Sequence, residues 1–113
     1  MRHTLLRTEK KYAEYEAAKK AGADSSFLRN GRKVLTWAIT QNQYPYDAIA
    51  SRHDLLHPAR KVANWNDLTQ QEMEDFGHIV TTLRDYDAVL YNINHAQTVR
   101  DWLHVHLLVF TKV

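Results

Sequence analysis

The chain has 113 residues, of which 44% are hydrophobic, so it is long and apolar enough for one domain with a buried core. Its net charge of +2 gives no specific nucleic-acid signal, although it permits a phosphate ligand. The absence of cysteine excludes a disulfide framework and a thiolate zinc site. No apolar run approaches the ~18 residues of a membrane span, and the first residues hold no apolar signal core, so we expect a cytoplasmic protein without a membrane partner.

The beginning of the chain predicts a helix and then a hairpin. Residues 8–21 are rich in helix formers and carry few bulky apolar side chains, so they predict a surface helix that ends at Gly22. The Asn-Gly pair at residues 30–31 is typical of a tight turn. We therefore expect a hairpin that joins a short strand near residues 27–28 to a clear strand over residues 34–40.

The middle of the chain predicts a second strand and a second helix. Residues 53–58 (His-Asp-Leu-Leu-His-Pro) predict a strand that ends at the proline, and residues 48–52 before it are either an extended connection or one helical turn. Thr69 and Glu72 have the spacing of a capping box, so a helix should begin there. Four apolar residues at helical spacing should form its core face: Met73, Phe76, Val80 and Leu83.

Two strands complete the chain, over residues 88–93 and residues 103–110. Because side chains alternate along a strand, His104 and His106 share one face, roughly 6.5–7 Å apart along the chain. The other members of that face are Trp102, Leu108 and Phe110. The opposite face is aliphatic and should pack on a core: Leu103, Val105, Leu107 and Val109.

The order of these elements predicts an α+β fold, with a mostly antiparallel sheet and two main helices. We expect a single domain, in which residues 1–26 are an N-terminal helical segment and residues 27–113 are the core.

Several short motifs, in the same order along the chain, resemble the histidine-triad (HIT) superfamily. Residues 97–99 (Gln-Thr-Val) and 104–108 (His-Val-His-Leu-Leu) resemble its signature, a Gln-Ser/Thr-Val loop followed by His-φ-His-φ-His-φ-φ, where φ is hydrophobic. Residues 53–61 resemble its His-φ-φ-φ-φ-Pro-Lys-Arg stretch. Residues 42–46 resemble its Asn-x-Tyr-Pro-Tyr segment, and residues 67–72 its Asp-Leu-Thr-x-x-Glu helix start. This resemblance implies a HIT-like fold.

The resemblance extends over residues 34–110 and has three departures. Trp102 stands where the family has the first histidine of its triad. One extra residue separates Gln97 from the histidines, and about three extra residues separate Asn42 from His53. The second and third triad positions keep their histidines.

The resemblance implies nucleotide hydrolysis or nucleotidyl transfer without a cofactor. His104 would attack the α-phosphate and form a nucleotidyl-histidine, because a neutral imidazole is nucleophilic near pH 7. His106 would hydrogen-bond the phosphate and assist the leaving oxygen. Gln97 and Thr98 would hold the non-bridging oxygens, and His53 would orient the histidines.

The resemblance also implies where the rest of the ligand lies. Asn42 and Asn92 are candidates for ribose or phosphate contacts, and Trp102 should border the ligand site. Dinucleoside polyphosphates and nucleoside phosphoramidates are candidate substrates. Many members of the family pair as homodimers by extending their sheets, so we expect a homodimer.

Two other classes of function remain open from the sequence. His104 and His106, with His53 or His95, have the chemistry of a metal site, although the strand supplies no carboxylate. The missing triad histidine is also compatible with a non-catalytic nucleotide-binding or interaction protein. His57 shares a strand face with His53, and it lies either beside the site or on the surface.

Overall fold

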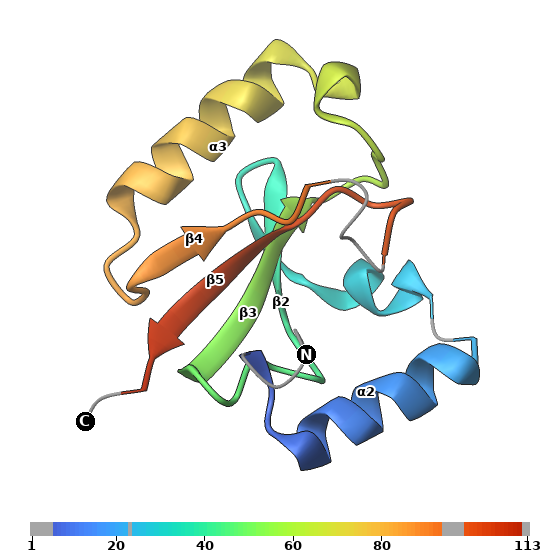
Figure 1. Ribbon diagram of the computed structural model, residues 1–113. Coiled ribbons are helices and arrows are strands. Elements are labelled where there is room, and N and C mark those ends of the chain that lie inside the picture. Colours follow the sequence, from blue (N-terminus) through green and yellow to red (C-terminus); the bar gives the residue numbers. More distant parts are fainter. Residues whose placement is uncertain (1–5, 23, 94–98, 112–113) are drawn as a thin grey trace.

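The computed structural model describes residues 6–22, 24–93 and 99–111. It has an α+β fold built on a five-stranded sheet in the order β1-β2-β3-β5-β4, in which all four strand pairs are antiparallel (Figure 1). The predicted α+β class and antiparallel sheet are therefore confirmed. In chain order the elements are α2 (Glu9–Lys20), the 3-10 helix η1 (Ser25–Asn30), β1 (Arg32–Val34), β2 (Trp37–Gln41), β3 (Ala50–Pro58), the 3-10 helix η2 (Trp65–Asp67), α3 (Gln70–Thr82), β4 (Ala88–Leu90) and β5 (Val105–Phe110).

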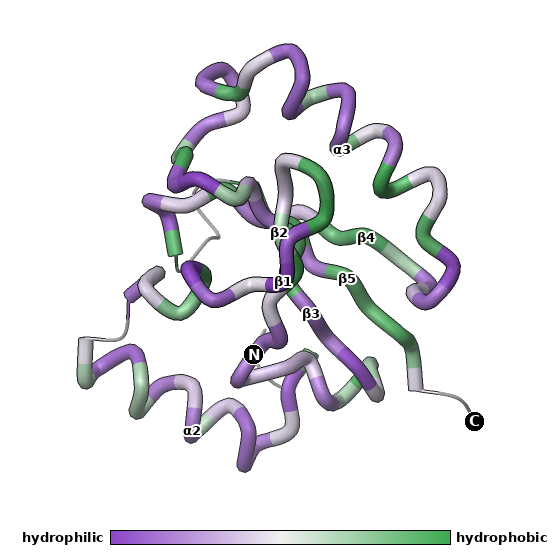
Figure 2. Tube along the Cα trace, turned by 180° about the vertical axis from the view of Figure 1, so that it is seen from behind, coloured by the Kyte–Doolittle hydropathy of each residue, from purple (hydrophilic) through white to green (hydrophobic). Residues whose placement is uncertain are grey.

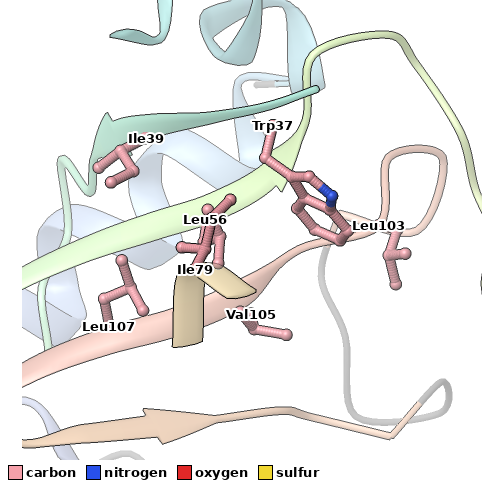
Figure 3. Packing of buried hydrophobic residues seen from close by; sticks show 7 residues of the cluster. All are labelled: Trp37, Ile39, Leu56, Ile79, Leu103, Val105 and Leu107. Atoms are coloured by element: carbon pink, nitrogen blue, oxygen red, sulfur yellow. The ribbon is translucent and has the colours of Figure 1, made fainter. Parts of the chain in front are cut away.

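The largest hydrophobic cluster lies between α3 and one face of the sheet. Figure 3 shows the indole of Trp37 between Leu56 and Leu103, with Val105 below it. Each of these side chains is at most 2% exposed. Ile39, Ile79 and Leu107 complete the cluster. Leu103, Val105 and Leu107 of the aliphatic face predicted for the last strand thus belong to the core, whereas Val109 is half-buried and lies outside the cluster.

The N-terminus of α3 and most of its apolar face agree with the sequence pattern, since Phe76, Val80 and Leu83 pack against the core cluster as predicted. Thr69 and Glu72 form the predicted capping box, in which the Thr69 amide donates to Glu72 Oε1 at 2.8 Å. Met73 was predicted to face the core and is 48% exposed, so that prediction is wrong. Asp75 and Ile79 are buried instead. The buried carboxylates of Glu72 and Asp75 accept hydrogen bonds from Arg60 and from Thr36.

The predicted hairpin lies at a different place in the chain. Residues 27–28 belong to η1 and not to a strand, because the Asp24 side chain accepts from the Ser26 amide and starts a helical turn there. Leu28 is then buried at 2% exposure. The segment predicted as one strand is split into β1 and β2 by a turn at Leu35, whose φ of 57° is left-handed. The prediction of a turn at residues 30–31 is therefore wrong.

The open question about residues 48–52 is also answered. Ala50 and Arg52 belong to β3 and pair with β5, with a shift of register between them. The last two strands are shorter than predicted, since β4 ends at Leu90 and β5 begins at Val105.

Helix α2 lies on the surface, as predicted, and buries none of its residues. Polar contacts attach its N-terminus to the loop before β3. The Thr8 amide donates to Asp47 Oδ1 at 2.8 Å, and Arg7 Nε donates to the Tyr44 carbonyl at 2.8 Å. Figure 2 shows α2 as a mostly hydrophilic stretch set apart from the sheet. In the described part of the chain, no helix has the length and apolarity needed to cross a membrane.

Candidate active site

Four histidines lie together on the face of the sheet opposite α3. His53 and His57 come from β3, while His106 comes from β5 and His104 from the residues just before it. The register places Leu55 opposite His106, which brings the imidazoles of the two strands to the same face. All four side chains are buried, with exposed fractions from 0 to 7%.

His53 and His106 form a direct hydrogen-bonded pair. His53 Nε2 lies 2.7 Å from His106 Nδ1, and the Tyr46 backbone amide donates to His53 Nδ1 at 3.0 Å. Because Nδ1 already accepts that proton, a neutral His53 carries its own proton on Nε2 and donates it to His106. His106 therefore accepts at Nδ1 and carries its proton on Nε2.

Asn92 lies at the outer end of this pair. Its side-chain amide is 3.2 Å from His106 Nε2 and 3.0 Å from the Tyr46 hydroxyl. Since His106 Nε2 is a donor, the amide oxygen of Asn92 must face it, and the hydroxyl of Tyr46 can donate to the same oxygen. Asn92 thus holds the donor nitrogen of His106 in place.

Asn42 contacts the other histidine of the pair. Its Oδ1 accepts from the Tyr44 amide at 2.8 Å, which fixes its Nδ2 toward His53 Nε2 at 3.3 Å. Both of these nitrogens carry protons, so the contact positions the His53 ring without adding a hydrogen bond.

Neutral His104 carries its ring proton on Nδ1, whereas His106 carries its own on Nε2. Its Nδ1 lies 2.9 Å from the carbonyl oxygen of Trp102, and a carbonyl only accepts, so Nδ1 carries the proton. The lone pair of neutral His104 is therefore on Nε2. Within the described residues nothing hydrogen-bonds to this nitrogen, and no buried side-chain nitrogen or oxygen lacks a partner, so Nε2 has contact with solvent. Its ring centroid is 5.3 Å from that of His106.

Burial keeps these imidazoles neutral. Desolvation is the main cause that lowers the pKa of His53 from 6.5 to about 4, and the positive charge of Arg7 acts in the same direction. Desolvation, followed by His53 and His104, lowers the pKa of His106 well below its usual value. Burial also lowers the pKa of His104, against the opposing effect of the Trp102 carbonyl. Near pH 7 the site therefore presents a neutral nucleophile beside a neutral hydrogen-bond donor.

His57 is a buried structural residue, which answers the question that the sequence left open. Its Nδ1 donates to the carbonyl of Pro58 at 2.8 Å, and its Nε2 accepts from Thr40 Oγ1 at 2.8 Å. Both ring nitrogens are thus occupied, and the residue has no exposed surface.

Trp102 contributes to the site through its backbone. The indole is 2% exposed, donates to the Pro58 carbonyl at 3.0 Å, and packs with Leu28 and Leu55. Its ring meets the edge of the His57 ring at 5.4 Å. That Trp102 borders a ligand stays a prediction, whereas its carbonyl oxygen sets the protonation of His104.

The histidine pair also depends on Tyr46, which sequence reasoning did not single out. Its ring stacks on His106 at 5.2 Å and packs against His53 at 4.4 Å. The guanidinium of Arg7 lies 4.8 Å from the same ring. The Tyr-Pro-Tyr segment that carries Tyr46 was part of the resemblance, and its place directly before His53 was the available signal.

Three residues that the sequence suggested for the site are not placed by the structure. Gln97, Thr98 and His95 lie outside the described residues.

Among the residues that are described, no three histidine or acidic side chains are grouped so that they could hold a metal ion. His53 and His106 instead point their nitrogens at one another, which leaves no room for an ion between them.

Comparison with models of known protein families gives no match to this chain, and comparison with curated protein sequences gives none either.

Proposed function

We propose that this chain is a HIT-like enzyme that hydrolyses or transfers nucleotides through a covalent intermediate on His104. The observation that supports this proposal most directly is which ring nitrogen carries the proton in each of two neighbouring histidines. His104 offers a solvent-accessible lone pair on Nε2, and His106 offers a proton on its own Nε2. The antiparallel α+β architecture and the order of the motifs support the assignment to the HIT type.

The first chemical step follows from these atoms. The Nε2 lone pair of His104 attacks the α-phosphorus, and the bond from phosphorus to the leaving group breaks. A leaving phosphate oxygen keeps the electron pair as an anion, and a leaving nitrogen takes a proton from solvent as it departs. His104 then carries phosphorus on Nε2 and a proton on Nδ1, and the Trp102 carbonyl stabilises the resulting positive charge. The bound phosphate replaces the Asn92 oxygen as the acceptor of the His106 Nε2 proton, while Nδ1 of His106 still accepts from His53.

The second step releases the product. Water, or another acceptor, attacks the phosphorus and loses its proton to solvent, and the bond to Nε2 breaks with its pair returning to His104. A neutral His104 is restored. By resemblance, Gln97 and Thr98 would hold the non-bridging oxygens during both steps.

A substrate panel tests this proposal. Dinucleoside polyphosphates and nucleoside phosphoramidates are incubated with the protein, and release of nucleoside monophosphate is measured. His104→Ala should abolish release, while His106→Ala should slow it by roughly 10²–10⁴-fold, the range for a lost hydrogen bond or acid–base contact. The exposed His78 provides the control, since His78→Ala should keep the wild-type rate. Wild-type turnover in His104→Ala would refute the mechanism.

One observation favours a second candidate, a nucleotide-binding protein without catalysis. Trp102 replaces the first triad histidine, and its indole donates its only proton to Pro58. The side chain therefore cannot take part in proton transfer. Single-turnover incubation with labelled nucleotide separates the two candidates, because a binder retains intact ligand and an enzyme releases or covalently holds the nucleotide.

A homodimer remains part of the proposal. Strand β4 lies at one edge of the sheet, and Val89 and Ile93 are 44% and 57% exposed there. An apolar edge strand is suited to pairing with a second sheet. Light scattering should give about twice the 13.3 kDa of one chain. A clean monomer at micromolar concentration would remove the dimer from the proposal without affecting the histidine chemistry.

A further inference from the structure

A concave site lies over β1, β2 and β3, lined mainly from the face of the sheet that carries α3, although Asn42 and His53 of the histidine site also line it. Its volume is about 420 Å³, within the range of small-ligand pockets. Arg32 pairs with Ile39 and Gln41 pairs with Asp54 across neighbouring strands, so these side chains share the face that Ile39 shares with α3. Figure 2 colours the stretches of β1 and β3 that border it as hydrophilic. The pocket residues used below are Arg32, Gln41, Ser51, Arg52 and Asp54.

The carboxylate of Asp54 in this pocket is already paired with an arginine. Asp54 is 4% exposed, and its Oδ2 accepts from Arg52 Nε at 2.9 Å and from the hydroxyl of Tyr86. Arg52 also donates to the Tyr86 hydroxyl at 3.1 Å. Burial and the neighbouring carboxylate raise the pKa of Tyr86 to about 12, so the phenol stays protonated and adds no negative charge.

A positive charge is left over in the pocket. Arg32 and Arg52 both line the pocket, and the positive charge of each acts on the phenol of Tyr86. One charge of Arg52 balances Asp54. The Arg32 side chain, by contrast, has no hydrogen bond or ion pair to any residue that the structure describes. The Gln41 side chain adds a neutral hydrogen-bond donor to the lining, whereas the Ser51 hydroxyl already donates to the Val109 carbonyl at 3.4 Å.

We infer that this pocket binds the oxyanion group of a small ligand, a phosphate or a carboxylate, between Arg32 and Arg52. Planar guanidinium groups match the oxygens of such groups, and the buried Asp54–Tyr86 contact holds Arg52 in position from below. The inference does not depend on the histidine chemistry, because none of the groups that it uses belongs to the pair of His53 and His106.

Nuclear magnetic resonance titration of the intact, ¹⁵N-labelled protein tests the inference. Inorganic phosphate and acetate are the two probes, each added at constant ionic strength with chloride as the balancing anion. The backbone amides of residues 51–52 and the side-chain Nε–H signals of Arg32 and Arg52 should move and reach saturation with at least one probe. The tighter probe identifies the oxyanion group. Phosphate that binds at the histidine site moves the amides of residues 104–106 instead.

Two variants make the result specific. Arg32→Met should weaken binding by about tenfold or more, the loss expected for a charge-assisted pair. Lys33→Met removes the same charge from the next position of β1, which points to the opposite face, and should leave binding unchanged. Both positions are exposed on an edge strand, so both variants should fold, which their spectra report. The inference is overturned by shifts that never saturate with either probe, by wild-type affinity in Arg32→Met, or by equal weakening in Lys33→Met.

Discussion

The two faces of β3 and β5 are built from alternate residues of the same strands, yet they differ completely in chemistry. Toward α3 the strands present Leu56, Val105 and Leu107, which are at most 1% exposed. On the other face the same strands present His53 and His106, at 2% and 5% exposure. Burial alone therefore does not decide between core and site. An imidazole is stable at this depth because it is neutral and its nitrogens have partners.

The largest expected effect comes from breaking the apolar face. Leu107→Ala should lower the free energy of unfolding by about 2–5 kcal/mol, because Leu107 has no exposed surface and the change leaves a cavity. Urea denaturation measures it. Met73→Ala, at a position that is 48% exposed on α3, should change stability by less than about 1 kcal/mol. Equal losses in the two variants would contradict the described orientation of α3.

The histidine face should make stability depend on pH. The folded-state pKa of His53 is about 4 and its ordinary value is 6.5, so between these values the unfolded chain binds more protons than the folded one. The stabilisation is complete above pH 6.5 and falls as the pH drops toward 4, by on the order of 3 kcal/mol for this residue.

Urea denaturation at pH 7 and pH 4.5 measures this dependence. The lowered pKa values of Glu72 and Asp75 place the loss of their stabilisation at still lower pH, so they contribute little within this window. The same stability at both pH values would show that the histidines are not buried as neutral groups.

A smaller effect should separate the structural histidine from the reactive one. Thr40→Val keeps the shape of the side chain but removes the hydroxyl that donates to His57 Nε2, so a buried acceptor loses its partner. The expected loss is about 1–3 kcal/mol of stability. Turnover should be unchanged at temperatures where the variant is folded, because His57 does not contact the lone pair of His104. A selective loss of kcat in Thr40→Val would place His57 in the reaction.

The smallest effect concerns Arg7, which lies outside both faces. Its positive charge disfavours protonation of His53 and His106, so Arg7→Met should raise the pKa of both imidazoles. Titration of the imidazole signals by nuclear magnetic resonance measures the change. Arg29→Met, a change of the same charge beside Trp102, should leave the pKa of His53 where it is. A pKa of His53 that falls or stays constant in Arg7→Met would contradict this electrostatic role.

The sequence was sufficient for those parts of the fold that local signals decide. The capping box at Thr69 and the surface helix 9–20 depend on residues close in the chain, and both were predicted. The hairpin was misplaced because burial of Leu28 against Trp102, a partner far along the chain, overrides the local preference of residues 30–31 for a turn. Met73 was misassigned because the acidic side chains of Glu72 and Asp75 are buried through distant polar partners, Arg60 and Thr36, which an apolar pattern does not report.

The histidines of the candidate site were predictable from the sequence, but the position of the proton on each imidazole ring was not. The motif order indicated His53, His104 and His106, and the structure brings them together on one face. Which nitrogen carries each proton depends on backbone groups, the amide of Tyr46 and the carbonyl of Trp102, and no side-chain pattern reports their direction.

The central claim is that the lone pair of His104 Nε2 is the nucleophile, and trapping the covalent intermediate tests it most directly. A wild-type reaction with a nucleotide substrate is quenched without acid, digested, and searched by mass spectrometry for a peptide that carries a nucleoside monophosphate. We predict that the modification is on His104, is labile to acid, and is absent from His104→Ala. Modification of His106 instead, or turnover without any modified histidine, would contradict the account.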